Sequence, residues 1–399
     1  MPSAVRLALA ATLLLSGTAL TFAQDAKPQC GGDFGQFLDG VRKEALSQGM
    51  SKAAVDAAIA DMHLDDKALA RDRAQGVFAQ DWRQFAGRMV NSYRLKIGKE
   101  KLEKYADVFA KVEAETGVPA PVITSFWGLE TDYGAVLGDF DTLSALATLA
   151  HDCRRPELFR PHLLAAIEIV DRGYLKPDEM KGAWAGEIGQ TQLLPEEYIK
   201  FGTDGDGNGT IDLRKDTPDV LFTTGKYIQS LGWRRGEPWL QAVKVPANFP
   251  WERAALVHKE PAANFAALGV TKADGSPLDD DKLPAALLLP MGRDGPAFLA
   301  YPNFDIYLAW NKSLVYSLTA AYFATRLAGA PPVDMGNPAP GLSVEETKRL
   351  QQRLTDLGHD VGAVDGIVGE NTRDAVRDEQ KRLGLPADGW PTKDLLSAL

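Results

Sequence analysis

The chain of 399 residues has only two cysteines and five histidines, and it lacks an excess of positive charge. The histidines are scattered and show none of the spacings of zinc ligands. With a formal net charge of −10, the chain is a poor candidate for binding nucleic acid. Any anionic polymer would have to be held by hydrogen bonds and stacking instead of electrostatic attraction. The hydrophobic content of 45% is typical of a globular protein. The length of 399 residues suggests two or three domains.

The first 23 residues have the pattern of a secretory signal peptide. Arg6 precedes a short apolar stretch, residues 7–15, and Thr21-Phe22-Ala23 offers small residues for cleavage. The apolar stretch is too short to span a bilayer. No cysteine that could carry a lipid anchor lies just after the cleavage point. We therefore expect residues 1–23 to be removed and the mature protein to be periplasmic and not lipid-anchored.

The two cysteines, Cys30 and Cys153, are expected to meet an oxidising compartment after export. A disulfide between them would tie the mature N-terminus to the middle of the chain. It would close a long loop and so restrict the unfolded chain, which stabilises the folded state. The alternative is that the two residues are separate buried thiols.

Helical periodicity dominates the chain. Apolar residues recur at helical spacing through residues 34–118 and 142–175, and further helices are expected over 217–231 and 311–327. Residues 233–304 are instead rich in proline and glycine, which indicates short strands and loops. The predicted fold class is α+β, mainly α, with a small strand and loop subdomain.

The C-terminal part is predicted to be a separate domain. Residues 330–341 contain four prolines and predict an extended, semi-rigid linker. A tail of 58 residues, 342–399, follows with three short helical patterns, a size at which a domain is only marginally stable alone. The main domain is therefore predicted over residues 24–329.

Glu130 lies in a largely apolar segment, residues 121–134. Pro119 and Pro121 suit the first turn of a helix, and Gly134 suits its end. A carboxyl group at the inner end of such a helix would be partly removed from water, which raises its pKa and keeps it a proton donor near neutral pH. This is the chemistry that splits a glycosidic bond. The alternative is a surface glutamate that closes a buried helix.

A second segment, residues 182–195, combines small residues with two amides. Its glycines and alanines let the backbone approach another surface closely, and Gln190 and Gln192 offer neutral donors and acceptors. Amides of this kind bind the hydroxyl and acetamido groups of an oligosaccharide. The alternative is a close contact between helices with two incidental glutamines.

A third segment has the oxygen-ligand spacing of a calcium loop. Asp204, Asp206 and Asn208 fall at loop positions 1, 3 and 5, with a glycine at 6 and the carbonyl of Thr210 at 7. Lys215 replaces the usual glutamate at position 12, so Asp216 or Asp219 would have to complete the shell. The alternative is a solvated turn of aspartates and glycines.

Several motifs in the same order resemble the B-type lytic murein transglycosylases, glycoside hydrolase family 103, over roughly residues 30–328. The tail resembles the small three-helix peptidoglycan-binding domain through Leu350-Gln-Gln-Arg-Leu354 and Val364-Asp-Gly-Ile-Val-Gly369. The motifs of the main domain are Phe126-Trp-Gly-Leu-Glu130-Thr-Asp-Tyr-Gly, Ala183-Trp-Ala-Gly-Glu-Ile-Gly-Gln-Thr-Gln192, Asp204-Gly-Asp-Gly-Asn-Gly and Trp310-Asn311-Lys-Ser-Leu-Val-Tyr316.

The resemblance implies a lysozyme-like catalytic domain that cleaves the β-1,4 bond between N-acetylmuramic acid and N-acetylglucosamine. The C6 hydroxyl of the muramoyl residue, not water, attacks the anomeric carbon and gives a 1,6-anhydro product. One carboxyl group acts first as acid and then as base. No cofactor is implied for this chemistry, and a structural Ca²⁺ is implied for the loop. The implied partners are peptidoglycan glycan strands and proteins of cell-wall synthesis or remodelling, and a monomer is expected.

The matching positions give each residue an implied role. Glu130 falls on the acid and base, and Gln192 falls on the amide that contacts the acetamido group. Ala183 departs from the family, since some members have a serine there that can bond to the catalytic carboxyl. The remaining matches are Tyr227, Asn311 and Tyr316 in the groove and Asp204, Asp206, Asn208 and Asp219 in the metal loop.

Two other functions stay open at this point. A lysozyme-type muramidase would hydrolyse the same bond with water as the nucleophile. A non-catalytic cell-wall-binding protein would need no buried acid. The acids close to Glu130 in sequence, Asp132, Asp139 and Asp141, are expected to be exposed at the helix end and the following turn. A single catalytic carboxyl suits an internal hydroxyl nucleophile, because no second carboxylate is then needed to attack the sugar.

Overall fold

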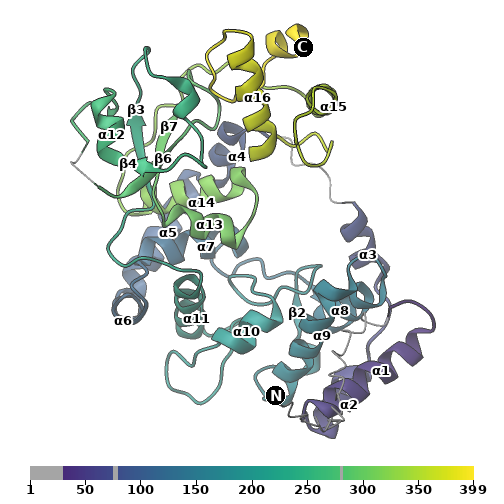
Figure 1. Cartoon of the computed structure of the whole chain (residues 1–399). Coiled ribbons are helices and arrows are strands. Elements are labelled where there is room, and N and C mark those ends of the chain that lie inside the picture. The colour runs from purple at the N-terminus through teal and green to yellow at the C-terminus, as the bar shows by residue number, and fades with distance from the viewer. Residues whose placement is uncertain (1–29, 75–79, 279–281) are drawn as a thin grey trace, which may run out of the picture.

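The computed structural model describes residues 30–74, 80–278 and 282–399. The predicted signal peptide, residues 1–23, lies outside these described residues. The described chain is mainly helical, with one five-stranded antiparallel sheet and a two-stranded one (Figure 1). This confirms the predicted class, α+β and mainly α. Among the described residues, no helix combines the length and the apolar character needed to cross a membrane.

One group of helices includes the first helices of the described chain and forms one part of the molecule (Figure 1). Its core contains the fully buried Val41, Leu146, Leu163 and Tyr198. The helices in this group are α1 (Phe34–Ser47), α2 (Lys52–Ile59), α3 (Asp66–Arg73), α8 (Thr142–His151), α9 (Pro156–Asp171) and α10 (Pro195–Phe201). The short strands β1 (Phe140–Asp141) and β2 (Lys181–Gly182) pair beside them.

Cys30 and Cys153 form a disulfide, with their Cα atoms 5.3 Å apart. Next to it, the backbone N–H of Gly31 donates to the carbonyl of His151 over 2.7 Å. The start of the described chain is thereby fixed to the end of α8. The bond spans a sequence separation of 123 residues. It is the pairing expected for an exported chain.

A second group of helices surrounds α7, which carries Glu130 at its C-terminal end. Phe126 and Trp127 of α7 are fully buried, and α7 packs on α14 across this core. The helices are α4 (Trp82–Met89), α5 (Ser92–Lys104), α6 (Ala106–Thr116), α7 (Ala120–Thr131), α11 (Thr217–Ser230), α13 (Phe304–Trp310) and α14 (Leu314–Leu327).

Helix α7 begins as the sequence predicts but ends earlier. Pro119 is its extended N-cap. The helix ends at Thr131 and not at Gly134, because Asp132 and Tyr133 both take left-handed backbone angles, with φ of 50° and 61°. Asp132 accepts from the guanidinium of Arg94 over 2.6 Å, and the hydroxyl of Tyr133 donates to the carbonyl of Arg94 over 2.7 Å. These bonds stabilise a conformation that is strained for residues other than glycine.

The predicted strand and loop region forms the five-stranded sheet, so that prediction is confirmed. Its strand order is β4-β6-β7-β3-β5, and every pairing is antiparallel. Two helices in or beside this region, α12 (Ala262–Ala267) and α13, were not predicted, and Asn311 ends α13 instead of starting a helix. The strands are β3 (Leu240–Lys244), β4 (Glu260–Pro261), β5 (Thr271–Lys272), β6 (Pro284–Leu288) and β7 (Ala297–Ala300).

The tail forms three helices, α15 (Val344–Asp356), α16 (Glu370–Arg382) and α17 (Lys393–Ala398), around a small core of its own. It also docks on the main domain. Arg373 is only 5% exposed and donates to the carbonyls of Leu289 and Pro290 over 3.2 and 2.7 Å. The domain is therefore held against the sheet side of the molecule, where Figure 1 shows α16.

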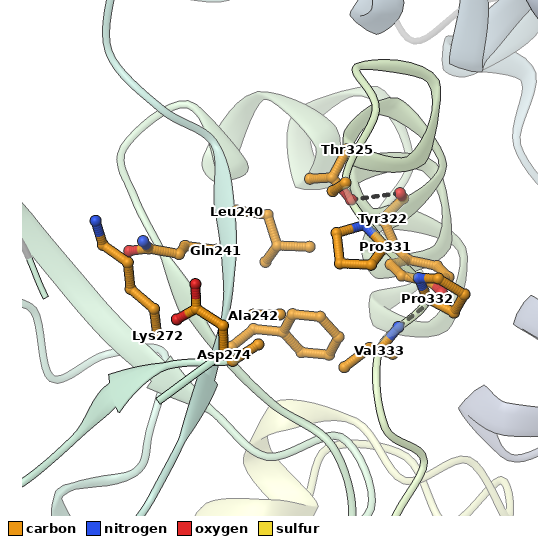
Figure 2. A pocket seen from close by; sticks show the side chains of 13 residues that line it. Leu240, Gln241, Ala242, Lys272, Asp274, Tyr322, Thr325, Pro331, Pro332 and Val333 are labelled. Atoms are coloured by element: carbon orange, nitrogen blue, oxygen red, sulfur yellow. Dashed lines mark hydrogen bonds between the residues drawn. The ribbon is translucent and has the colours of Figure 1, made fainter. Parts of the chain in front are cut away.

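Residues 330–341, the predicted linker, form no helix or strand and pack along the main domain. The N–H of Val333 donates to the hydroxyl of Tyr322 over 3.3 Å, and the indole of Trp390 donates to the carbonyl of Ala339 over 2.9 Å. Figure 2 shows Pro331, Pro332 and Val333 beside Tyr322 at a cavity of about 270 Å³ that β3 closes on the other side. The tail is thus fixed in position and does not behave as a freely tethered module.

The disulfide yields a prediction about stability. Replacing both cysteines, as Cys30→Ser with Cys153→Ser, is expected to lower the free energy of unfolding by up to roughly 4 kcal/mol, because the long loop is no longer closed in the unfolded chain. Chemical denaturation followed by tryptophan fluorescence measures this change. A reducing agent should destabilise the wild type to a similar extent and leave the double variant unchanged. An unaltered denaturation midpoint would contradict a stabilising role for the bond.

Candidate active site

A cavity of about 310 Å³ opens at the C-terminal end of α7. The loop after β2, the start of α10, the last turns of α11 and the end of α13 form its other walls. It therefore lies where the two helical groups meet. The lining residues are Glu130, Ala183, Glu187, Gln192, Leu193, Leu194, Glu197, Tyr227, Trp310 and Asn311.

Two neighbours fix the carboxyl group of Glu130. The hydroxyl of Tyr316 and the indole N–H of Trp310, the latter over 3.0 Å, both donate to the same oxygen, Oε1. Because Oε1 is held as an acceptor by two donors, Oε2 is the oxygen left to carry a proton. This arrangement gives the carboxyl group one defined proton-transfer atom.

Burial raises the pKa of Glu130 from its ordinary value to about 7. The bonds from Tyr316 and Trp310 act in the opposite direction, since they stabilise the charged form, and the negative charge of Glu187 adds to the rise. The apolar neighbours named from the sequence, Phe126 and Trp127, are fully buried in the same helix. A carboxyl group with a pKa near 7 can give and take a proton at neutral pH.

Aromatic rings form the wall beside Glu130. The ring of Trp310 stacks on that of Phe126 with centroids 4.2 Å apart, which orients the indole N–H toward the carboxyl group. Tyr227 also packs against Trp310, with the ring centroids 5.3 Å apart. Burial raises the pKa of Tyr227 to about 12, so its hydroxyl stays protonated near neutral pH. Aromatic faces of this kind suit the apolar faces of sugar rings.

Gln192 lines the cavity and shows a constrained backbone. Its φ is +52°, in the left-handed region, and its side-chain Nε2 donates to the carbonyls of Leu137 and Gly189 over 3.2 and 2.8 Å. Both N–H bonds of the amide are thereby used by the protein. The carbonyl oxygen Oε1 is left as an acceptor for a ligand donor such as the N–H of an acetamido group.

The structure does not support the predicted ligand contact of Gln190. This residue is only 6% exposed, and its amide is used within the core. Its Oε1 accepts from the indole of Trp127 over 2.8 Å, and its Nε2 donates to the carbonyl of Arg214 over 3.1 Å. Gln190 therefore links α7 to the loop before α11, and its role is structural. The backbone turn between Gly189 and Gln192 directs the two amides to opposite sides.

The other predicted groove residues meet at the cavity. Tyr227 and Asn311 line it, and Tyr316 lies behind Glu130 as a donor to its carboxyl group. The side-chain oxygen of Asn311 accepts from the backbone N–H of Ser313 over 2.9 Å, which leaves its amide N–H bonds for a ligand. The positions implied by the family resemblance are therefore brought together from α7, α11, α13 and α14.

Three residues that the sequence analysis did not assign also belong to the site. Trp310 donates to Glu130, and Glu187 and Glu197 add two further carboxyl groups to the same cavity. Trp310 directly precedes Asn311 in one of the family motifs, and this adjacency is the feature of the sequence that could have identified it. The acids close to Glu130 in sequence lie elsewhere, since Asp132 binds Arg94 and Asp141 caps α8.

The predicted calcium loop gathers three carboxylates. Oxygens of Asp204, Asp206 and Asp219 lie within 4.8 Å of one another. Asp204 accepts the backbone N–H groups of Gly207 and Gly209 over 2.7 Å each, which curls the loop around this carboxylate. Asp219 reaches the loop from the first turn of α11.

Asp216, the alternative to Asp219 for completing the shell, has a different role in the structure. It is the N-cap of α11 and accepts the N–H of Asp219 over 3.3 Å. Asn208 accepts from the backbone and side chain of Thr210 over 2.8 and 2.7 Å. Asp219 is fully buried, and burial raises its pKa to about 6, with Asp216 and Asp204 adding to the rise. Three acids grouped so closely, of which Asp219 is buried, fit a hard cation, whose charge offsets their repulsion.

Two known family models match the chain. The family model described as transglycosylase SLT domain matches residues 33–325, and a peptidoglycan binding domain model matches residues 343–399. Both matched ranges lie within the domain ranges predicted from the sequence. The first covers well over half of the chain and contains every residue of the cavity.

Individual relatives agree with the family models. The membrane-bound lytic murein transglycosylase B of Escherichia coli K12 is 27% identical over 238 residues, which are 59% of this chain and 64% of that protein. The match thus spans less than two thirds of the relative's length. SltB3 from Pseudomonas aeruginosa, solved with NAG-anhNAM-pentapeptide, is 35% identical with a TM-score of 0.86, covering 92% of this chain and 99% of that one.

A more distant structure shares the main domain. The E. coli lytic transglycosylase SLT35, solved with calcium, is 26% identical with a TM-score of 0.62 and covers 76% of this chain and 97% of that one. The matched models and the similarity to SltB3 over nearly the whole chain agree on one classification. The chain belongs to the lytic transglycosylase family of enzymes that act on peptidoglycan, and it carries a C-terminal peptidoglycan-binding domain.

Proposed function

We propose that the protein cleaves the β-1,4 bond between N-acetylmuramic acid and N-acetylglucosamine in peptidoglycan and forms a 1,6-anhydromuramoyl end. The observation that carries the proposal is the carboxyl group of Glu130, which has one oxygen bound by two donors and a pKa of about 7. Such a group can act as acid and base in turn. The NAG-anhNAM-pentapeptide bound to SltB3 is a fragment with the expected kind of end.

In the first step, Oε2 of protonated Glu130 donates its proton to the glycosidic oxygen, and the bond from that oxygen to the anomeric carbon breaks. Glu130 is then a carboxylate, which the donors Tyr316 and Trp310 stabilise. In the second step this carboxylate takes the proton of the C6 hydroxyl while the hydroxyl oxygen bonds to the anomeric carbon. The proton is back on Glu130 at the end, so no water is consumed.

The amides around the cavity are assigned to positioning the sugar. The free oxygen of Gln192 accepts the N–H of an acetamido group, and the N–H bonds of Asn311 donate to a hydroxyl or carbonyl. Holding the C6 hydroxyl near the anomeric carbon makes the attack intramolecular, which greatly favours it over attack by water. The fixed tail places a second glycan-binding surface at a constant position relative to the cavity.

A lysozyme-type muramidase is the second candidate. Glu187 and Glu197 line the same cavity as Glu130, and a second carboxylate is what a retaining hydrolase needs. The two reactions give different ends, since hydrolysis adds the mass of one water to each cut. The family membership favours the anhydro product.

We infer that the enzyme works in the periplasm after export. The signal-like pattern of residues 1–23 and the Cys30–Cys153 disulfide support this location, because disulfides persist in oxidising compartments. Peptidoglycan is also found there.

We further infer that Ca²⁺ binds the loop formed by Asp204, Asp206 and Asp219. The carbonyl of Thr210 and the side chain of Asn208 are assigned as further ligands from their positions in the loop. The calcium complex of SLT35 supports the assignment. The ion would fix the start of α11, which carries Tyr227 into the cavity, and it would take no part in the bond cleavage.

Replacing the acid tests the catalytic assignment. Glu130→Gln keeps the shape of the side chain but cannot transfer a proton, so turnover of purified sacculi is expected to fall at least roughly 1,000-fold. Mass spectrometry of the wild-type products should show anhydromuramoyl ends. Binding of the variant to sacculi and its melting temperature should remain unchanged.

The matched control is Glu113→Gln, which removes the same charge from an exposed position of α6 that does not line the cavity and should keep full activity. A Glu130→Gln variant that clears sacculi as fast as the parent would overturn the assignment. Reducing muramoyl ends among the wild-type products would show that the enzyme hydrolyses the bond and does not form the anhydro end.

The raised pKa of Glu130 gives a pH prediction. Only the protonated form can donate to the glycosidic oxygen, and this form is lost as the pH rises through the pKa, at about 7. We expect kcat/KM on soluble glycan strands to fall about tenfold per pH unit well above that value. Rates measured from pH 5 to 9 at constant ionic strength test this. A profile that stays flat up to pH 9 would contradict the assignment of Glu130 as the acid.

Metal removal tests the calcium site. Chelation is expected to lower the melting temperature by several degrees, since binding at saturating Ca²⁺ stabilises by roughly 2–4 kcal/mol. Asp219→Asn should abolish the response to added Ca²⁺, whereas Asp61→Asn, an exposed aspartate in the turn after α2, should retain it. Differential scanning fluorimetry with and without chelator measures both. Equal melting temperatures in the wild type would rule out a structural ion.

A further inference from the structure

Glu187 is fixed in the wall of the cavity by its own loop. Its carbonyl accepts the N–H of Ala183 over 2.9 Å, and its Oε2 accepts the N–H of Ala185 over 3.2 Å. The next residue, Ile188, is bridged on both sides, to Gly182 and to Leu193. A side chain on Gly182 would come within 1.9 Å of the Glu187 carbonyl, so the loop closes only with glycine there. The position of the Glu187 carboxyl group is therefore set by the backbone.

The cavity has no cationic side chain to offset its acids. Its walls contain three carboxyl groups, from Glu130, Glu187 and Glu197, and among the described lining residues there is no lysine, arginine or histidine. Two ionised carboxylates in one cavity repel each other, and the one that ionises second keeps its proton to a higher pH. The order of ionisation therefore decides which group can act as an acid.

A backbone donor favours the charged form of Glu187, and the charge of Glu187 in turn acts on Glu130. The backbone N–H of Ala185 donates to the Glu187 carboxylate and favours the charged form, although burial raises the pKa of Glu187 above its ordinary value. Glu130 is the group whose pKa the neighbouring charge raises further, after burial. The charge of Glu197 acts instead on Tyr227 and on His162.

We propose that Glu187 is a positioning residue whose fixed negative charge keeps the proton on Glu130 until the glycosidic oxygen takes it. The proposal rests on the function proposed for Glu130. Glu187 touches no reacting atom in this account. It acts through its negative charge, which opposes ionisation of Glu130 across the cavity. Ala183 also lines the cavity, but it has no polar side-chain group and cannot take this role.

The other titratable groups near Glu130 act differently. Tyr316 on α14 donates to its carboxyl group and favours ionisation, and Tyr227 on α11 stays a neutral phenol near pH 7. Glu197 on α10 is the other acid of the cavity and serves as the comparison. Removing the charge of Glu187 should therefore lower the pKa of Glu130 more than removing that of Glu197.

The test is Glu187→Gln, which keeps the size of the side chain and removes its charge. The alkaline limb of the kcat/KM profile should move to lower pH by roughly half a unit, because a like charge no longer opposes ionisation of Glu130. The readout is the pH at which the alkaline limb falls, taken relative to each protein's own rate on the acid side of the profile, where Glu130 is protonated. The control is Glu196→Gln, an exposed acid on α10, which should leave the profile unchanged.

A second measurement does not depend on turnover. NMR titration of proteins with carboxyl-labelled glutamate follows the Glu130 signal, identified by its loss in Glu130→Gln, and should show the same shift in Glu187→Gln. An unchanged pKa of Glu130 would overturn the proposal even if activity fell. A loss of activity at every pH with an unchanged pKa would place Glu187 in direct contact with substrate instead. If Glu130→Gln stays active, the function proposed for Glu130 is wrong. The NMR shift would still test whether the charge of Glu187 raises the pKa of Glu130.

Discussion

The chemistry of the site depends on the burial of one carboxyl group at the end of a buried helix. Helix α7 lies in the core through Phe126 and Trp127, and its last turn brings Glu130 to the wall of a cavity. Removal from water raises the pKa of this group, and two donors on one oxygen limit the rise and fix the geometry. The balance of these opposing effects places the pKa near neutrality, where one group can serve as acid and as base.

Much of this site could be predicted from the sequence. The prolines at the start of α7, its apolar positions and the family motifs pointed to Glu130, and the motifs also pointed to Gln192, Tyr227 and Asn311. The partners of Glu130 could not be derived from local spacing, because Trp310 and Tyr316 lie 180 and 186 residues away along the chain. Only the packing of α13 and α14 on α7 brings them to the carboxyl group.

The two glutamines show a different limit. Gln190 and Gln192 are equivalent by composition, and both were predicted to bind substrate. The left-handed backbone at Gln192 turns one amide into the cavity and the other into the core. A pattern of residue types does not reveal such a turn. For the same reason the acids close to Glu130 in sequence lie outside the cavity, and Glu187, which is more distant, lies inside it. The helices were predicted from periodicity, but their ends were set by contacts such as that of Asp132 with Arg94.

Neutron diffraction from deuterium-exchanged crystals near pH 6 tests the central claim most directly, because it locates the proton itself. The account predicts a deuteron on Oε2 of Glu130, with Oε1 accepting from the deuterated hydroxyl of Tyr316 and indole of Trp310. A Glu130 carboxylate without a deuteron at that pH would contradict the claim that burial keeps this group protonated.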